Sequence, residues 1–276
     1  YVYFGKTGVF KLDLDGKILW EGTAGDKSHG WGCGTSPVLY KNLVILNASV
    51  ESGSLVALDK RTGKQIWKTD GMEMSWNTPH LADAGGGRKE LVVSVHGFVL
   101  GCDPDTGKEL WRCKATEDYI CPSIVSRGNI VYAIGGRRSE THAIRTGGRG
   151  DVTGSHKLWQ ADVGANVSSP VIQGDYLYWV SDRNNTAYCL KLSDGSVVYS
   201  EKFPDQPYAS SLAADGKLYI VTRRGGTFIL PAEPRFEILG KNRLESDNGQ
   251  FNATPIIAGG KLILRSDTTL YCLSNP

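Results

Sequence analysis

One short pattern recurs along this chain of 276 residues, and it constrains the fold more than any other feature. Most copies place a turn glycine, often in Thr-Gly-Lys or Asp-Gly-Lys, four residues before an aromatic residue. The aromatic column comprises Trp20, Trp67, Trp111, Trp159 and Tyr199. Its spacing of about 40 to 48 residues lies in the range of propeller-blade repeats. A period of this length predicts one structural unit that is copied along the chain.

A second column keeps the same period and consists of a small residue followed by proline. Its members are Ser36-Pro37, Thr78-Pro79, Cys121-Pro122, Ser169-Pro170 and Thr254-Pro255, with Ser210-Ser211 as a weakened copy. Between the two columns, short apolar runs alternate with turns, which predicts four strands per repeat. Four such antiparallel strands cannot bury both faces alone, so neighbouring repeats must stack. We therefore predict an all-β fold, a β-propeller of four-stranded antiparallel blades. Because their offset from the turn repeats with the blade, the four tryptophans of the aromatic column are expected to be structural and buried at blade interfaces.

The repeat divides the chain into five complete and two partial blades. Complete blades are expected over residues 32–71, 76–115, 119–165, 166–208 and 209–247, and partial blades over residues 1–25 and 251–276. The unbroken period argues against two separate β-sandwiches and for a single domain over residues 1–276. About seven blades, the first and last incomplete, also fit a fragment of an eight-bladed ring. Because the chain begins at Tyr1 inside a repeat, we expect an excised or processed piece whose export signal lay upstream.

Charge and hydropathy exclude two broad classes of function. The chain has 31 Lys and Arg against 29 Asp and Glu, a formal net charge of +2. Binding to a phosphate backbone normally needs a clustered basic surplus, so general nucleic-acid binding is not expected. No apolar run approaches the roughly 18 residues that cross a bilayer, so no transmembrane segment is predicted either.

The cysteines are interpreted through the repeat. Cys121 occupies the small-residue slot before proline, and Cys189 and Cys272 align with Ala57, so these three are expected to pack as small apolar residues. Cys102 and Cys113 flank one hairpin, which leaves a disulfide between them open.

Three other motifs have structural explanations. None of the five histidines is spaced for metal binding with another histidine or a cysteine. Residues 30–34, Gly-Trp-Gly-Cys-Gly, resemble a phosphate loop, but no helix follows them, which predicts a tight turn between blades. Arg149-Gly150-Asp151 lies in a long hairpin from Thr146 to His156, and this adhesion tripeptide is interpreted as a chance match. No catalytic or metal-ligating residue is predicted.

One face of the propeller collects residues that differ between repeats. Segments that enter the innermost strands and turns between second and third strands emerge on this face, whereas the Thr-Gly-Lys turns emerge on the other. Candidate ligand-binding residues on it are Trp31, Trp76, Asn77, Tyr119, Asn166, Arg183, Tyr208, Arg223, Arg224 and Asn252, with Arg137 and Arg138 on the same set of turns. Aromatic rings and Arg forks suit a flat or anionic ligand or a protein partner. The alternative is that the rings pack against the next blade and the Arg side chains are merely solvated.

Residues 57–67, Ala-Leu-Asp-Lys-Arg-Thr-Gly-Lys-Gln-Ile-Trp, resemble the tryptophan-docking motif of PQQ-like propeller repeats, and Gly101 to Trp111 repeat it. The resemblance extends to quinoprotein dehydrogenases, to the propeller lipoprotein of outer-membrane assembly, and most closely to the PQQ-binding-like repeat proteins of planctomycete-type bacteria. It implies the fold over essentially the whole chain. It is weak for function, because the motif serves blade packing in catalytic and non-catalytic members alike.

Two functions remain under comparison. The first is a non-catalytic binding or protein-assembly scaffold, periplasmic or secreted, with a protein or small anionic ligand on the variable face and no cofactor. The alternative is a PQQ- and calcium-dependent quinoprotein oxidoreductase acting on alcohols or sugars, with Glu73, Asp118, Asp182 and Asp267 as candidate carboxylates. The chain lacks the adjacent cysteine pair typical of the alcohol dehydrogenases that it resembles, which favours the scaffold.

Overall fold

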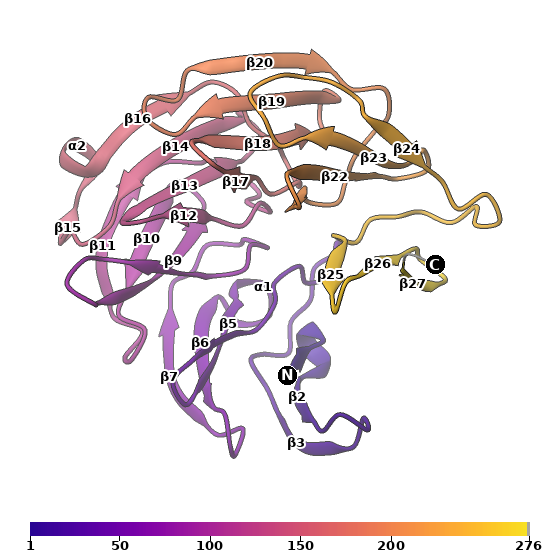
Figure 1. Ribbon diagram of the computed structural model, residues 1–276. Helices are drawn as coiled ribbons and strands as arrows, with labels where there is room; N and C mark the ends of the chain where they lie inside the picture. Colours follow the sequence, from indigo (N-terminus) through magenta and orange to yellow (C-terminus); the bar gives the residue numbers. More distant parts are fainter. Residues whose placement is uncertain (275–276) are drawn as a thin grey trace. The chain divides into compact units, whose positions relative to one another are not determined.

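The computed structural model describes residues 1–274, and its strands form seven sheets that are the blades of a β-propeller (Figure 1). Chain contacts divide it into two compact units, Tyr1–Gln160 (unit 1) and Ala161–Pro276 (unit 2). The β-propeller predicted from the repeat is therefore confirmed. The expectation of a single domain stays a prediction.

Unit 1 contains the first four blades. Blade 1 has β1 (Val2–Tyr3), β2 (Val9–Leu12) and β3 (Ile18–Gly22), with a 3₁₀ turn at Gly5–Thr7. Blade 2 has β4 (Val38–Tyr40), β5 (Leu43–Ala48), the short helix α1 (Ser49–Ser52), β6 (Ser54–Asp59) and β7 (Gln65–Asp70). Blade 3 has β8 (His80–Asp83), β9 (Lys89–Val95), β10 (Phe98–Cys102) and β11 (Glu109–Lys114). Blade 4 has β12 (Val125–Arg127), β13 (Ile130–Gly135), β14 (Glu140–Arg145) and β16 (Lys157–Ala161).

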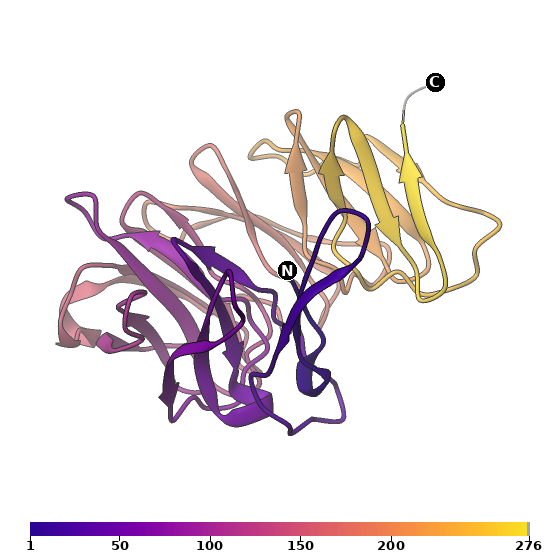
Figure 2. The ribbon, with the colours of Figure 1, turned by 90° about the horizontal axis from the view of Figure 1, so that it is seen from below.

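Unit 2 contains the other three blades, and the second view in Figure 2 shows their strands side by side within each blade. Blade 5 has β17 (Val171–Gln173), β18 (Tyr176–Ser181), β19 (Thr186–Lys191) and β20 (Val197–Lys202). Blade 6 has β21 (Leu212–Ala214), β22 (Lys217–Thr222), β23 (Gly226–Pro231) and β24 (Gly240–Asn242). Blade 7 has β25 (Ile256–Ala258), β26 (Lys261–Arg265) and β27 (Leu270–Leu273). Among the described residues, blades 1 and 7 have three strands each, as expected of incomplete repeats.

Blade 3 has a fifth strand that comes from the connection between β14 and β16. In this connection, β15 (Gly150–Asp151) pairs in parallel with β11, and α2 (Thr153–His156) follows it. The anchor is Glu90, which is 2% exposed and accepts hydrogen bonds from Trp111 Nε1 (2.7 Å) and the Gly147 amide (3.0 Å). Arg149 lies 3.4 Å from the other oxygen of Glu90. The Arg-Gly-Asp tripeptide is thus held in sheet and ion-pair contacts.

Each blade packs face to face on its neighbour within a unit. Between blades 2 and 3 the core includes Ile45, Ala57 and Trp67 on one side and Leu91 and Val93 on the other. Equivalent apolar clusters lie between blades 1 and 2, 3 and 4, 5 and 6, and 6 and 7. The alternation of side chains along each strand supplies one apolar face to each neighbour, so stacking buries both faces.

The aromatic column docks on the glycine turn of the following blade. A Cβ atom at Gly63 of blade 2 would lie 2.6 Å from the ring of Trp20 in blade 1, and one at Gly107 of blade 3 would lie 2.5 Å from the ring of Trp67 in blade 2. Both glycines also have positive φ angles, +73° and +74°. Any side chain at these turns would displace the docked indole, so the motif couples two blades.

Burial differs along the aromatic column. Trp67 is 8% exposed and Trp111 is fully buried, as predicted for side chains between blades. Trp20 and Trp159 are only half-buried. The expectation that all four tryptophans are buried is thus wrong for Trp20, whose blade presents exposed Ile18 and Leu19 beside it on β3, and for Trp159.

All six cysteines lie within residues 1–274 and none of them forms a disulfide, so the candidate bridge between Cys102 and Cys113 is wrong. Cys102 packs in the core between blades 2 and 3, whereas Cys113 packs in the core between blades 3 and 4. The two thiols therefore lie on opposite faces of one sheet. Strand pairing confirms the alignment of Cys189 with Ala57, because the two residues face Tyr199 and Trp67 at equivalent register positions.

Among the described residues, no helix combines the length and apolarity required to cross a membrane.

Replacement of Trp67 by alanine should lower the free energy of unfolding by about 3 to 5 kcal/mol, because it empties the space above Gly107. Trp20→Ala should cost less, since that ring is half-buried. Trp31→Ala, at a side chain that is 63% exposed, is the matched control and should change stability by less than about 0.5 kcal/mol. Urea denaturation followed by circular dichroism measures all three. Equal losses for Trp67 and Trp31 would contradict the docking role.

Protonation of a buried histidine should weaken the fold in acid. His142 is 1% exposed, and burial, aided by the charge of Lys157, lowers its pKa to about 4. The folded state therefore binds fewer protons than the unfolded state between about pH 6.5 and pH 4, and stability falls as the pH is lowered through this window. In His142→Gln this part of the pH dependence should disappear. Urea denaturation at pH 7.5, 6 and 4.5 tests this, and an unchanged slope in the variant would contradict it.

Candidate functional site

Aromatic side chains from three successive connections meet in unit 1. The ring of Trp31 lies 5.6 Å from that of Trp76 and 5.0 Å from that of Tyr119, between centroids. His29 joins them, with its ring 5.2 Å from both Trp31 and Trp76. The guanidinium of Arg137 lies over the Tyr119 ring at 4.5 Å. We call His29, Trp31, Trp76, Tyr119 and Arg137 the aromatic cluster.

Backbone contacts hold the members of the aromatic cluster in place. The predicted tight turn at residues 30–34 is present, since the Gly32 amide donates to the carbonyl of His29 (2.9 Å). The carbonyl oxygen of Gly32 accepts a hydrogen bond from the indole N–H of Trp76 (2.9 Å). The Trp76 amide in turn donates to the carbonyl of Ile120 (2.7 Å), next to Tyr119. Connections that enter three blades are thus linked to one another by hydrogen bonds.

The two tryptophans of the aromatic cluster differ sharply in exposure. Trp76 is 5% exposed and forms the base, whereas Trp31 lies on it and is 63% exposed. An exposed indole has an apolar surface that a partner can cover, and its position is set by the rings beneath it. The aromatic cluster is therefore a preformed apolar surface with one cation at its edge.

The backbone beside Tyr119 is held in an uncommon conformation. Asp118 and Tyr119 have φ angles of 56° and 33°, in the left-handed region that non-glycine residues rarely occupy. The amide of Asp118 donates to Nδ1 of His96 (3.0 Å), and Arg138 forms an ion pair with Glu117 (2.8 Å). These contacts offset a conformational cost of about 1 to 3 kcal/mol per residue, which is characteristic of functional loops.

A smaller group of the same kind forms in unit 2. The guanidinium of Arg223 lies over the Tyr208 ring at 4.8 Å. It donates to the side-chain oxygens of Asn252 (3.0 Å) and Gln250 (2.7 Å). In both units an Arg from a turn between second and third strands covers an aromatic residue that precedes an innermost strand. The turns between second and third strands thus meet the connections before innermost strands in each unit.

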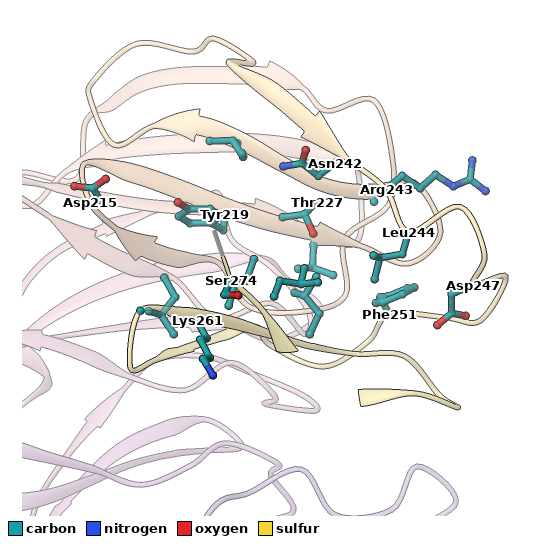
Figure 3. Close-up of a pocket in the computed structure, with 18 of the residues that line it drawn as sticks. Asp215, Tyr219, Thr227, Asn242, Arg243, Leu244, Asp247, Phe251, Lys261 and Ser274 are labelled. Carbon is teal, nitrogen blue, oxygen red and sulfur yellow. The ribbon is translucent and has the colours of Figure 1, made fainter. Parts of the chain in front are cut away.

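The remaining candidates lie apart from these groups. Asn77 is fully buried and donates to the Ser94 carbonyl at 2.5 Å, so its amide serves the fold rather than a ligand. The backbone N–H of Asn166 donates to the carboxylate of Asp182 (3.0 Å). Arg183 is exposed on the turn between β18 and β19. Arg224 lines a pocket between blades 6 and 7 instead of joining Arg223 (Figure 3).

Two members of these groups are not among the candidate residues predicted from the sequence. His29 lies two residues before Trp31, and Gln250 lies two residues before Asn252. Neither belongs to the repeated columns, so only their closeness to a candidate residue could have indicated them. Across residues 1–274, no group of three or more His, Cys, Asp or Glu side chains is placed to hold a metal ion.

Comparison with solved structures adds a likeness in fold. BamB from Moraxella catarrhalis superposes with a TM-score of 0.58 and 13% identity, covering 94% of this chain and 88% of that protein. At this identity the likeness concerns the fold alone.

Sequence comparison identifies relatives over part of the chain. An outer membrane protein assembly factor BamB from Bordetella pertussis is 30% identical over 134 residues, 48% of this chain and 32% of that protein. A 1-butanol dehydrogenase (quinone) from Thauera butanivorans is 30% identical over 130 residues, 41% of this chain and 20% of that enzyme. The matches thus span a third or less of the relatives' own lengths.

The family comparison covers more of the chain than either relative. The model of a PQQ-type family, described as outer membrane protein assembly factor BamB, matches residues 1–201. This segment includes the whole aromatic cluster and every intact copy of the glycine–aromatic motif. The chain therefore belongs to this family of PQQ-like β-propellers.

Proposed function

We propose that this chain is a non-catalytic scaffold that binds a protein partner through the aromatic cluster. The observation that carries the proposal is Trp31, which is 63% exposed on a base formed by Trp76 and Tyr119. Aromatic and Arg side chains dominate the binding energy of protein interfaces when they are held rigidly near the centre of the contact. The family description and the Bordetella relative support a role in protein assembly.

The proposal includes a periplasmic or secreted location. It is supported by the names of the relatives, which refer to assembly at the outer membrane. The group formed by Tyr208, Arg223 and Asn252 in unit 2 is included as a second contact for the partner or for a small anionic ligand. Its Arg223 already has two side-chain acceptors, so an anion there must compete with neutral amide oxygens.

The alternative is a PQQ- and calcium-dependent oxidoreductase, which the match to the butanol dehydrogenase favours. Calcium beside a quinone needs several grouped carboxylate and carbonyl oxygens. Asp118 instead lies 3.6 Å from Nδ1 of His96, and Asp182 accepts backbone hydrogen bonds from Asn166 and Val167. The grouping of acidic and histidine side chains does not fit such a site, and we assign no redox step to this chain.

Complementation in the bacterium that carries the gene tests the scaffold. In a deletion strain the full chain should restore the amount of folded outer-membrane β-barrel proteins, measured by heat-modifiable mobility in gels. Trp31→Ala combined with Tyr119→Ala should restore clearly less, because the apolar contact is lost. Lys108→Ala, on a Thr-Gly-Lys turn, is the control and should restore as well as the unaltered chain. Full restoration by the double variant would contradict the proposal.

Titration of the purified protein with PQQ and calcium separates the two functions. On the scaffold proposal, the quinone absorbance should show no saturable change up to about 100 µM PQQ. Stoichiometric binding, with dye reduction by an alcohol or a sugar, would establish the oxidoreductase instead. In that case Arg183→Ala with Arg223→Ala should weaken binding more than either substitution alone, since a quinone with several carboxylates uses more than one Arg.

A further inference from the structure

Blade 6 lacks the docking aromatic that its sister blades carry. Strand pairing aligns the position: Trp67 faces Ala57 in blade 2, Trp111 faces Gly101 in blade 3, and Tyr199 faces Cys189 in blade 5. In blade 6 the corresponding pair is Gly240 and Ile229. A bulky aromatic opposite a small residue has thus been exchanged for glycine opposite isoleucine.

The exchange leaves open space beside blade 6. A Cβ atom added to Gly240, at the position that Trp67 holds in blade 2, would meet nothing within 4 Å. Gly240 shares its side of β24 with Asn242, and both pair with residues of β23 that line a pocket between blades 6 and 7. The pocket has a volume of about 610 Å³, inside the range of small-molecule and side-chain sites.

The pocket is lined mainly by apolar side chains, and its lining also includes the charged residues Asp215, Arg224, Arg243, Asp247 and Lys261. Its walls are Tyr219, Val221 and Ile229 from blade 6 and Leu262, Leu264 and Leu273 from blade 7. In Figure 3, Leu244 and Phe251 close one end, and the charged end of Arg243 points away from the interior. The apolar walls therefore favour an occupant with an apolar ring.

One hydroxyl group belongs to the wall of the pocket. Thr227 is 5% exposed as a residue and lines the pocket. Figure 3 shows this hydroxyl directed into the pocket. This hydroxyl oxygen can accept a hydrogen bond, so an occupant that brings an N–H donor gains more than a pure hydrocarbon.

We propose that this pocket binds a tryptophan side chain presented by a protein partner. An indole fills the equivalent place in blades 2 and 3, where Trp67 and Trp111 are buried, and an indole N–H can donate to the hydroxyl of Thr227. The partner thereby completes the blade interface that Gly240 leaves unfilled. The site uses residues of unit 2 alone and is independent of the aromatic cluster and its proposed function.

The probe is a peptide that copies the chain's own docking segment. It has the sequence Gly-Lys-Gln-Ile-Trp-Lys-Thr of Gly63–Thr69, carries 5-fluorotryptophan, and is titrated against the full chain by ¹⁹F NMR. Saturable binding is expected. The peptide with alanine in place of tryptophan should fail to compete. N-acetyltryptophanamide should bind at least about tenfold more weakly than the peptide, and equal affinity would assign the pocket to a free aromatic ligand and overturn the proposal.

Variants of the chain locate the binding. Gly240→Trp fills the pocket from inside and should weaken peptide binding by about tenfold or more while raising stability. Lys241→Trp is the matched control, because Lys241 pairs with Phe228 on the other side of the same strand, and it should bind within about twofold of the unaltered chain.

A conservative variant and a distant one complete the test. Thr227→Val keeps the shape but removes the hydroxyl and should weaken binding about threefold or more, which gives a readout even if Gly240→Trp folds poorly. Trp31→Ala should leave binding unchanged. Unaltered affinity in both Gly240→Trp and Thr227→Val, or loss of binding in Trp31→Ala, would show that the peptide binds elsewhere and overturn the proposal.

Discussion

The contact between an indole and the glycine turn of the next blade is the constraint on which the other features depend. A four-stranded sheet has two apolar faces and no edge-to-edge partner, so its stability comes from its neighbours. Trp20 over Gly63 and Trp67 over Gly107 couple successive blades at the same relative position. The glycine supplies both the positive φ of the turn and the space for the ring. Because one residue pair carries both roles, the motif recurs with little variation.

Two blades have additional or altered features at the position of the docking aromatic. In blade 3 the Nε1 of Trp111 donates to buried Glu90, which also anchors the extra strand β15. In blade 6 the aromatic is replaced by Gly240, and a pocket lies on the same side of the blade. In a repeat protein, the other blades show which residue type is expected at each position. The glycine at position 240 therefore stands out, because the equivalent position in blade 2 holds Trp67.

The candidate site is built from connections between strands, whereas the blades are built from the strands themselves. Its residues lie on connections where the repeat tolerates variation, and the strands serve only to aim them. The rings of Trp31, Trp76 and Tyr119 come together because three successive connections emerge on one face. Arg137 and Arg223 show that the turns between second and third strands reach the same connections in both units. Rigid blades and variable loops are thereby separated in the sequence as well as in space.

Sequence reasoning was sufficient for the blades because their signals are local and repeated. A turn glycine, an aromatic four residues later and a small residue before proline recur, so each copy supports the interpretation of the others. The same reasoning placed Trp31, Trp76 and Tyr119 on one face, since strand direction alternates in every blade. The hydrogen bond from the Asn77 side chain to the Ser94 carbonyl could not be predicted, because side-chain hydrogen bonds produce no periodic pattern in the sequence.

The amino-acid sequence by itself determined the propeller fold, since the fold is set by periodic patterns of apolar and turn residues. Only the tertiary structure decided which side chains meet. It put Cys102 and Cys113 on opposite faces of a sheet, joined His29 to the aromatic cluster, and aligned Gly240 with the docking tryptophans. These outcomes depend on strand register and on contacts between residues far apart in the chain, where a shift of one residue moves a side chain to the other face.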